Sequence, residues 1–421
     1  MKIHPECRGA GRTAFQMLCA CLVAMLPATA LAQWPGWGGP DRNFTSSAKG
    51  LSSTWPKDGP KQIWKRDLGE GYSSIAADDG RLYTMYRKDG NEVVVALDAK
   101  TGDTLWEHMY PAKMIESIST KFGEGPQSTP LVEGGRVYTL GKTGRLDCVN
   151  AKTGKPIWSH DLVEEYGVKP PEFGFASSPV AYKNSLITVG GGKGYGMLAF
   201  DLETGSLLWH KNDFENTYSS PIIINVDGQD QAVVLVDREV VGVSAATGEL
   251  QWRHPHENQW KTNIGTPHYG SDGLLYVKSG GEAGSRALRL TRKGEKTEVE
   301  EIWADKKLGS GQGNVVRVGD HYYGSFGENK APFMAAINAK TGETVWKERG
   351  HVKATMILAD GKLIMLDEKG TLSLAKVGPK GIEIMSKVDK LLEEKAWTVP
   401  TLVGKTLYLR DSKSILALDL G

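Results

Sequence analysis

The sequence predicts an all-β fold in which eight similar four-stranded units close into a ring, an eight-bladed β-propeller. Three observations lead to this prediction. One motif, made of an apolar run, a Thr-Gly turn and a tryptophan, recurs with little change along the chain. The copies are separated by roughly 40 to 50 residues, a period typical of propellers and solenoids. The chain also ends one strand short of a complete unit and begins with one strand to spare.

The repeated motif is clearest at residues 93–106 and recurs at 148–158, 199–209, 242–252 and 336–346. In each copy an apolar, often β-branched run leads into the turn, and a second run ends on tryptophan. Asp, Asn or Ser opens the turn by bonding to nearby backbone groups, and Gly supplies a positive φ. Each copy is therefore predicted to be a β-hairpin that joins two neighbouring strands of one sheet.

Residues 1–32 have the features of a secretory signal peptide. Three basic residues precede the apolar run 15–26, and Ala30-Leu-Ala32 offers a small-residue cleavage site. At about a dozen residues, the apolar run is too short to span a bilayer. We therefore expect cleavage after Ala32 and a soluble exported protein, periplasmic or secreted. Lipid attachment at Cys21, within Leu-Cys-Ala-Cys, is the alternative.

Charge and cysteine content exclude several classes of protein. The whole chain carries a formal charge of +1 and the leader +2, which leaves about −1 after cleavage. A nearly neutral protein has no electrostatic basis for binding nucleic acid or an anionic membrane. Three of the four cysteines lie in the leader, so Cys148 cannot form an intrachain disulfide. Cys148 stands where other copies have Ala or Gly, which predicts inert packing.

Residues 33–60 are rich in Trp, Pro, Gly and Ser and show no strand period. We call this segment the lead-in and expect it to lie along the body of the ring, anchored by Trp34, Trp37 and Trp55. Residues 61–68 then have the pattern of a fourth strand without the first three. Residues 61–421 together are predicted to form one propeller domain.

Eight repeats follow, and each is expected to contain strands A to D with short A–B and C–D turns. They cover residues 73–108, 127–160, 177–211, 219–254, 265–303, 312–348, 353–388 and 398–421. The fifth has lost its Thr-Gly turn and has the charged insertion 293–301. The seventh is degenerate, with Met385 in place of tryptophan. A seven-bladed ring is therefore the alternative.

The end of the chain favours eight blades. Because the last repeat stops after its third strand, residues 61–68 can supply the fourth, closing the ring and removing exposed sheet edges. The outer strand of one blade is expected to dock on the next blade, and burial of a tryptophan at that contact is sufficient to explain why each repeat has one. Eight outer strands are marked by Trp64, Trp106, Trp158, Trp209, Trp252, Trp303, Trp346 and Met385.

These units resemble the repeats of pyrroloquinoline-quinone (PQQ) dehydrogenases and of their non-catalytic relatives, which include the BamB-type outer-membrane assembly lipoproteins. The resemblance rests on the recurring Ala-Leu-Asp-Ala-Lys-Thr-Gly-Asp-Thr-Leu-Trp106 and covers nearly the whole chain after the leader. The segments Trp34-Pro-Gly-Trp-Gly-Gly-Pro-Asp-Arg-Asn43 and Gly71-Tyr-Ser-Ser74 resemble a subgroup of secreted, PQQ-like bacterial propellers. The resemblance implies the eight-bladed fold, with either quinone chemistry or a scaffold role.

The resemblance implies that a quinone enzyme would hold PQQ over the centre of the ring, with a calcium ion and often a vicinal disulfide. This sequence lacks the disulfide, a Cys-x-x-Cys-His haem site and a visible Asp/Asn/Glu calcium loop. We therefore predict no catalytic residues and no cofactor, with calcium-bound PQQ as the alternative. His108, His160, His210 and His254 occupy similar positions in different repeats, so they should lie apart and form no metal site.

The connections between strands differ in length. The A–B and C–D turns are short and alike, whereas the D–A and B–C loops, on the opposite face, are long and dissimilar. Binding residues concentrate on variable loops of rigid scaffolds, and aromatic residues beside charges are common interface anchors. The candidate partner-binding residues are Phe122, Glu124, Phe173, Phe175, Trp260, Lys261, Asn263 and Phe333.

The sequence thus predicts an exported, non-catalytic binding or assembly scaffold that uses its long-loop face. The expected partner is a protein or another component of the cell envelope, and the protein itself is expected to be a monomer. Two alternatives belong to other classes: a PQQ-dependent alcohol or sugar dehydrogenase, and a propeller that binds or cleaves carbohydrate. Acids and amides converging beside a flat aromatic surface would favour the quinone enzyme.

Overall fold

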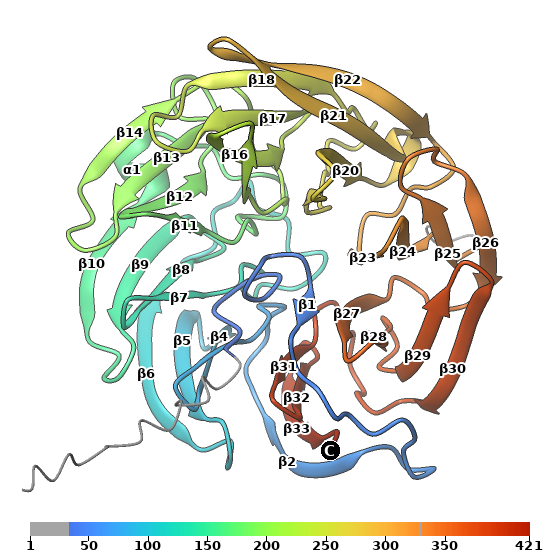
Figure 1. The fold of residues 1–421 in the computed structure, drawn as a ribbon. Helices are drawn as coiled ribbons and strands as arrows, with labels where there is room; N and C mark the ends of the chain where they lie inside the picture. The colour runs from blue at the N-terminus through green and yellow to red at the C-terminus, as the bar shows by residue number, and fades with distance from the viewer. Residues whose placement is uncertain (1–32, 328–330) are drawn as a thin grey trace, which may run out of the picture. The chain divides into compact units, whose positions relative to one another are not determined.

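The computed structural model describes residues 33–327 and 331–421. Their strands form eight antiparallel four-stranded sheets, one of which gains a short fifth strand, and the sheets follow one another round a ring (Figure 1). The predicted eight-bladed β-propeller is confirmed. The signal-peptide prediction falls on residues 1–32, outside the described part of the chain.

Each blade runs from an inner to an outer strand in sequence order. Blades 1 and 2 contain β3 (Ala76–Asp78), β4 (Arg81–Lys88), β5 (Asn91–Asp98), β6 (Thr104–Pro111), and then β7 (Leu131–Glu133), β8 (Arg136–Leu140), β9 (Arg145–Asn150), β10 (Pro156–Asp161). Blades 3 and 4 contain β11 (Val180–Tyr182), β12 (Ser185–Val189), β13 (Met197–Asp201), β14 (Leu207–Lys211), and then β15 (Ile222–Val226), β16 (Gln229–Leu235), β17 (Glu239–Ser244), β18 (Leu250–Pro255).

The second half of the ring repeats this order. Blades 5 and 6 contain β19 (His268–Tyr269), β20 (Leu274–Lys278), β21 (Ser285–Lys293), β22 (Lys296–Asp305), and then β23 (Val315–Val318), β24 (His321–Phe326), β25 (Phe333–Asn338), β26 (Thr344–Arg349). Blade 7 contains β27 (Thr355–Ala359), β28 (Lys362–Leu366), β29 (Leu372–Gly378), β30 (Gly381–Val388), and blade 8 begins with β31 (Thr401–Val403), β32 (Thr406–Arg410), β33 (Ser414–Asp419). The described helices are short, α1 (Leu162–Tyr166) and η1 (Gly281–Ala283), and none is long and apolar enough to cross a membrane.

The ring closes where the sequence predicts. Strand β2 (Lys61–Asp67) pairs antiparallel with β33, with Lys61 opposite Asp419 and Asp67 opposite Ser414. It becomes the outer strand of blade 8, so the first strand of the propeller completes the last sheet (Figure 1). The edge that β33 would otherwise expose is thereby paired.

The middle strands are buried on both faces because each sheet lies between two neighbours. In β5 every residue from Glu92 to Leu97 is buried, and Cys148 in β9 is fully buried as well. Burial raises the pKa of the Cys148 thiol to about 12, so the thiol stays protonated. In blade 5 the charged insertion 293–301 lengthens the hairpin of β21 and β22.

The recurring tryptophans join neighbouring blades. The indole N–H of Trp106 donates to the carbonyl oxygen of Ala151 in the next blade at 2.9 Å. The same bond to the following blade is made by Trp64, Trp158, Trp303 and Trp346. Trp252 differs because blade 5 has no Thr-Gly turn, and its N–H donates to Gln231 of its own blade at 2.7 Å.

The lead-in does not simply lie along the body. It runs across the centre of the ring (Figure 1): Trp34 forms a bridge with Ala77 of blade 1, and β1 (Thr45–Ser46) pairs parallel with β27 of blade 7. The innermost strands offer unpaired backbone groups, and the lead-in satisfies several of them. Two residues are too few for a strand period, so the sequence did not indicate β1.

Candidate functional site

A pocket of about 820 Å³ lies at the centre of the ring on the face of the D–A and B–C connections. All eight D–A connections contribute side chains to it, because these connections converge towards the ring axis. Aromatic and charged residues dominate its wall: Trp37, Tyr72, Lys121, Phe122, Glu172, Phe173, Tyr218, Trp260, Lys353, Glu368, Lys395 and Trp397. We call it the axial pocket.

Five aromatic rings follow one another along one side of the axial pocket. Ring centroids are 5.0 Å apart for Tyr72 and Trp397, 5.5 Å for Trp397 and Phe122, 5.1 Å for Phe122 and Phe173, and 5.9 Å for Phe173 and Tyr218. They come from five successive D–A connections, and we call them the aromatic row. Their tilted and edge-on contacts hold one another in place, so the row is a preformed apolar surface.

Trp260 lines the pocket from the connection between blades 4 and 5, and half of its surface is exposed. Its backbone N–H donates to Asn258 Oδ1 at 2.9 Å, and Asn258 Nδ2 donates to Asn263 Oδ1 at 2.7 Å. Asn263 is fully buried and donates in turn to the carbonyl oxygen of Val236. The connection is therefore fastened to the blades while it presents a large ring to solvent.

The lead-in supplies Trp37, whose indole N–H donates to Thr266 Oγ1 at 2.8 Å. The next residues of both segments line a different cavity: Pro40 to Asn43 from the lead-in and Pro267 from the blade. The lead-in thus separates the axial pocket from the cavity on the other face.

Charges beside the aromatic row are arranged around Trp397. Glu368 accepts from the indole N–H of Trp397 at 2.7 Å and pairs with Lys353 at 3.2 Å. The Nζ of Lys395 lies 4.5 Å from the centroid of Trp397, and that of Lys121 lies 5.5 Å from Phe122, both in cation–π geometry. In the described part of the chain Lys121 and Lys395 form no salt bridge, so both place an unpaired positive charge beside Phe122 and Trp397.

A buried polar network holds the connection that contains Phe122. Lys142 Nζ donates to the carbonyl oxygen of Gly123 at 2.9 Å, and Glu92 accepts from the backbone N–H of Lys142 and from the hydroxyl of Tyr110. Burial lowers the pKa of Lys142 to about 8 and raises the pKa of Glu92 above its usual range. Their carboxylate–ammonium attraction opposes both shifts without cancelling them.

The structure distributes the eight candidate residues over three environments. Phe122, Phe173 and Trp260 line the axial pocket. Glu124 and Lys261 lie outside its lining, in salt bridges with Arg87 at 3.0 Å and Asp237 at 3.5 Å.

The other three candidates pack within the blades. Phe175 is 2% exposed and Asn263 is fully buried, so neither presents a side chain to a partner. Phe333 packs against Phe326 with ring centroids 6.0 Å apart, away from the lining. An aromatic or amide side chain in a long loop can equally fasten that loop, and the sequence does not distinguish the two uses.

Sequence reasoning missed Tyr72, Lys353, Lys395, Trp397 and Glu368. Tyr72 stands in Gly71-Tyr-Ser-Ser74, and Trp397 follows the degenerate seventh repeat, where no period marks its position. A weak signal was available, since both precede the first strand of a repeat, as Phe122 and Phe173 do. Aligning the residues of all D–A connections by their distance from the strand A that follows would have identified Tyr72 and Trp397.

The axial pocket meets one condition for a calcium-bound quinone, because acid and amide groups lie beside the aromatic row. These groups are Gln127, Glu172, Gln312, Asn314 and Glu368. Glu368 is already bound to Trp397 and Lys353, and Asn314 makes two bonds to the backbone of Met356 at 2.8 Å. Within residues 33–327 and 331–421, no three His, Cys, Asp or Glu side chains gather where they could hold a metal ion.

A closed eight-bladed ring of Trp-docked repeats, with a pocket on its axis, is the arrangement expected of a PQQ-like propeller. The chain belongs to the family whose model is described as outer membrane protein assembly factor BamB, which matches residues 36–121 and 90–347. It is 25% identical over 247 residues to BamB of Yersinia pestis, 55% of this chain and 56% of that protein. It is 30% identical over 135 residues to the quinohemoprotein alcohol dehydrogenase ADH IIB of Pseudomonas putida, 31% of this chain and 18% of that enzyme.

Solved structures agree on the fold. BamB from Moraxella catarrhalis superposes with a TM-score of 0.59 at 14% identity, covering 85% of this chain and 97% of that one. Quinohemoprotein alcohol dehydrogenase from Comamonas testosteroni superposes with a TM-score of 0.65 at 14% identity, covering 94% of this chain and 82% of that one. The sequence matches span less than two thirds of the curated relatives' length, and about a fifth of the dehydrogenases'.

Proposed function

We propose that this protein is an exported, non-catalytic scaffold that captures a protein partner of the cell envelope in its axial pocket. The observation behind the proposal is the aromatic row, a preformed apolar surface on the face with long connections. Aromatic residues that are already in place are the usual hot spots of protein interfaces. The assembly role in the name of the BamB relatives supports the same function here.

Because the binding surface is already formed, it can capture a partner without first folding around it. Trp260 is half exposed, yet the Asn258–Asn263 hydrogen bonds hold its backbone. A rigid anchor loses little conformational entropy when it binds, so more of the contact energy appears as affinity. Lys121 and Lys395 beside Phe122 suit a segment in which acidic residues flank an aromatic or aliphatic one.

Site-specific cross-linking tests the proposal. A photo-reactive phenylalanine analogue replaces Phe173 or Trp260 in the full chain, and in control proteins it replaces Lys100 or Lys152, which are exposed in the Thr-Gly turns of the opposite face. Irradiation of living cells should attach the same envelope protein at both pocket positions and not at the control positions. Equal cross-linking at all four positions, or none at the pocket, would contradict the proposed function.

A PQQ-dependent alcohol or sugar oxidation is the second candidate, favoured by the lysines beside the aromatic row and by the similarity to quinoprotein dehydrogenases. The scaffold proposal expects neither tight PQQ binding nor turnover. Titration with PQQ and calcium, followed by dye-linked assays with alcohols and aldoses, separates the two. Quinone-dependent turnover that Trp397→Ala abolishes would replace the scaffold by the enzyme.

A further inference from the structure

A groove of about 790 Å³ adjoins the axial pocket on the same face of the ring. Its wall comes from the B–C turn of blade 7 and from the connection between blades 7 and 8. We call it the side groove, and its lining residues are Glu368, Lys369, Thr371, Asp389, Lys390, Leu392, Glu393, Glu394 and Lys395. Glu368 and Lys395 also line the axial pocket, so a chain bound in one cavity can continue into the other.

Backbone contacts hold the two walls of the side groove together. The N–H of Leu391 donates to the carbonyl oxygen of Gly370 at 3.0 Å, and the N–H of Ala396 donates to that of Glu368 at 3.2 Å. A Cβ atom at Gly370, whose φ is +78°, would collide with the carbonyl oxygen of Leu392. The walls are therefore closely packed, and the groove is formed before a partner binds.

Each of the four carboxylates in the groove wall has a lysine partner from outside the wall. The pairs, with their N–O distances, are Glu368 with Lys353 at 3.2 Å, Asp389 with Lys387 at 2.9 Å, Glu394 with Lys413 at 3.0 Å and Glu393 with Lys65 at 3.9 Å. Asp367, next to the wall, accepts from the backbone N–H groups of Lys369 and Thr371 at 2.9 and 3.0 Å. The acids around the groove are thus already engaged.

The three lysines of the groove wall have no such partner. Lys369, Lys390 and Lys395 are exposed and form no salt bridge within residues 33–327 and 331–421. Lys395 lies over Trp397, and Lys121, also without a salt bridge in those ranges, lies beside Phe122. Unpaired ammonium groups therefore continue from the aromatic row into the side groove. Together they attract carboxylates, most strongly at low ionic strength.

The other end of the aromatic row has the opposite charge. Glu172 lines the axial pocket and forms no salt bridge in the described part of the chain. Burial and, after it, the charge of Glu172 raise the pKa of Tyr218, the last ring of the row, to about 12. An acidic group of a partner is therefore repelled near Tyr218 and attracted near Trp397 and Phe122.

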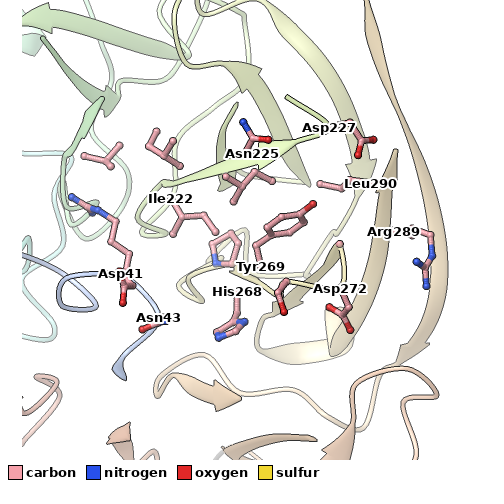
Figure 2. Close-up of a pocket in the computed structure, with 18 of the residues that line it drawn as sticks. Asp41, Asn43, Ile222, Asn225, Asp227, His268, Tyr269, Asp272, Arg289 and Leu290 are labelled. Carbon is pink, nitrogen blue, oxygen red and sulfur yellow. The ribbon is translucent and has the colours of Figure 1, made fainter. Parts of the chain in front are cut away.

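The cavity on the other face of the ring shows no such excess of one charge. Its volume is about 1060 Å³, and the carboxylates of Asp41 and Asp227 line it together with Arg42 (Figure 2). An acidic segment would meet carboxylates there, whereas the lysines that line the side groove are unpaired. The charges therefore favour the side groove for such a segment.

We propose that the side groove binds an acidic stretch of the partner chain, next to the apolar residue that lies on the aromatic row. This inference rests on the proposed function, because the axial pocket holds that apolar anchor. Lys121 and Lys395 face the acidic residue nearest the anchor, and Lys369 and Lys390 face those that follow. Because Glu172 repels acids at the other end of the row, the acidic stretch lies on one side of the anchor only, over blade 7.

Cross-linking from the groove tests the course of the partner chain. A photo-reactive phenylalanine analogue at Lys369 of the full chain should attach the same envelope protein as the analogue at Phe173. Mass spectrometry should place the attachment in an acidic stretch within about ten residues of the Phe173 attachment, since an extended chain advances about 3.3 Å per residue. If neither Phe173 nor Trp260 attaches a partner, the proposed function fails and this inference with it. If they do, while Lys369 attaches nothing or a stretch without acids, only the side groove is excluded.

Removal of two charges measures the contribution of the groove. Lys369→Gln with Lys390→Asn should weaken binding of the purified partner about tenfold at low salt, and about twofold or less in about 0.5 M NaCl, because salt screens exposed charges. Asn tolerates the φ of 55° at position 390, so the melting temperature should not change.

The control is Lys100→Gln with Lys152→Gln, which removes the same charge from the opposite face and should leave the affinity unchanged. The proposal is overturned if the groove variant binds the partner as the natural chain does, or if the control variant loses as much affinity. It is also overturned if the groove variant keeps its partner but no longer binds phosphatidylglycerol vesicles, because the lysines would then serve a membrane surface.

Discussion

Gly154 packs directly against Trp106 of the preceding blade: a Cβ atom at Gly154 would lie 2.5 Å from Cε3 of that tryptophan. The same relationship joins Gly102 to Trp64, Gly205 to Trp158, Gly248 to Trp209 and Gly342 to Trp303. There are therefore two reasons why the Thr-Gly turn needs glycine. It supplies the positive φ of the turn, and it leaves space for the neighbouring blade's tryptophan.

Gly154→Ala should destabilise the protein more than a glycine replacement that meets no neighbour. The φ of +69° costs alanine about 1–2 kcal/mol, and the clash with Trp106 adds about 1–3 kcal/mol. Gly90→Ala is the matched control, because its φ is +78° with nothing within 4 Å. Urea unfolding of both variants measures the difference, and equal losses would show that the tryptophan imposes no requirement on the turn.

Removal of β2 should open the ring. A protein that lacks residues 33–68 leaves β33 without its partner strand, and an unpaired edge favours aggregation. A protein that lacks residues 33–52 loses most of the lead-in but keeps β2, and should remain monomeric with a lowered melting temperature. Light scattering and thermal unfolding compare the two. A monomeric 33–68 deletion with an unchanged melting temperature would refute closure by β2.

Acidification should destabilise the protein through His256. This residue is fully buried, and neither ring nitrogen has a partner in the described part of the chain. Burial, with the charges of Arg286 and His254, lowers the pKa of His256 from 6.5 to about 3. The unfolded state therefore binds the proton more tightly than the folded state does. The contribution of His256 to the free energy of unfolding is complete above pH 6.5 and is lost as the pH drops towards 3. At pH 5 the loss is about 2 kcal/mol.

Urea unfolding at pH 7 and pH 5 measures this loss. His256→Gln should reduce the difference between the two pH values. His210→Gln, which changes an exposed histidine, should leave the difference as it is in the natural chain. The same pH dependence in all three proteins would assign the effect to other groups.

Trp260→Ala and Phe173→Ala should each lower the affinity for the cross-linked partner about thirtyfold, which corresponds to about 2 kcal/mol, the usual threshold of a hot spot. Each ring lines the axial pocket, so the melting temperature should change little. Fluorescence anisotropy with the purified partner measures affinity.

The control for the pocket variants is Lys100→Glu with Lys152→Glu on the opposite face. These two lysines are preferred to Asp360, which lies on the same face, because Asp360 accepts from the backbone N–H of Leu51 at 3.0 Å and pairs with Lys362 at 2.8 Å, and so holds the lead-in. If the control pair abolishes capture while Trp260→Ala and Phe173→Ala have no effect, the binding face is the other one.

The sequence by itself predicted the repeated blades and favoured eight of them over seven. Strand and turn signals are local, because a β-branched run, a turn opener and a Gly with positive φ act within about ten residues. The same signals recur in each repeat. The missing fourth strand at Asp419 and the extra strand at Lys61 then left one way to close the ring.

Only the tertiary structure decided which side chains meet in the pockets. Tyr72 and Trp397 stand at opposite ends of the chain and become neighbours because β2 closes the ring. Phe122 and Phe175 look alike in sequence, yet one lines the axial pocket and the other is buried between blades. Loop sequences have no periodicity from which the direction of a side chain can be predicted, because that direction depends on how strand ends far apart in the sequence pack together. The path of the lead-in between the two pockets depends on the same long-range packing.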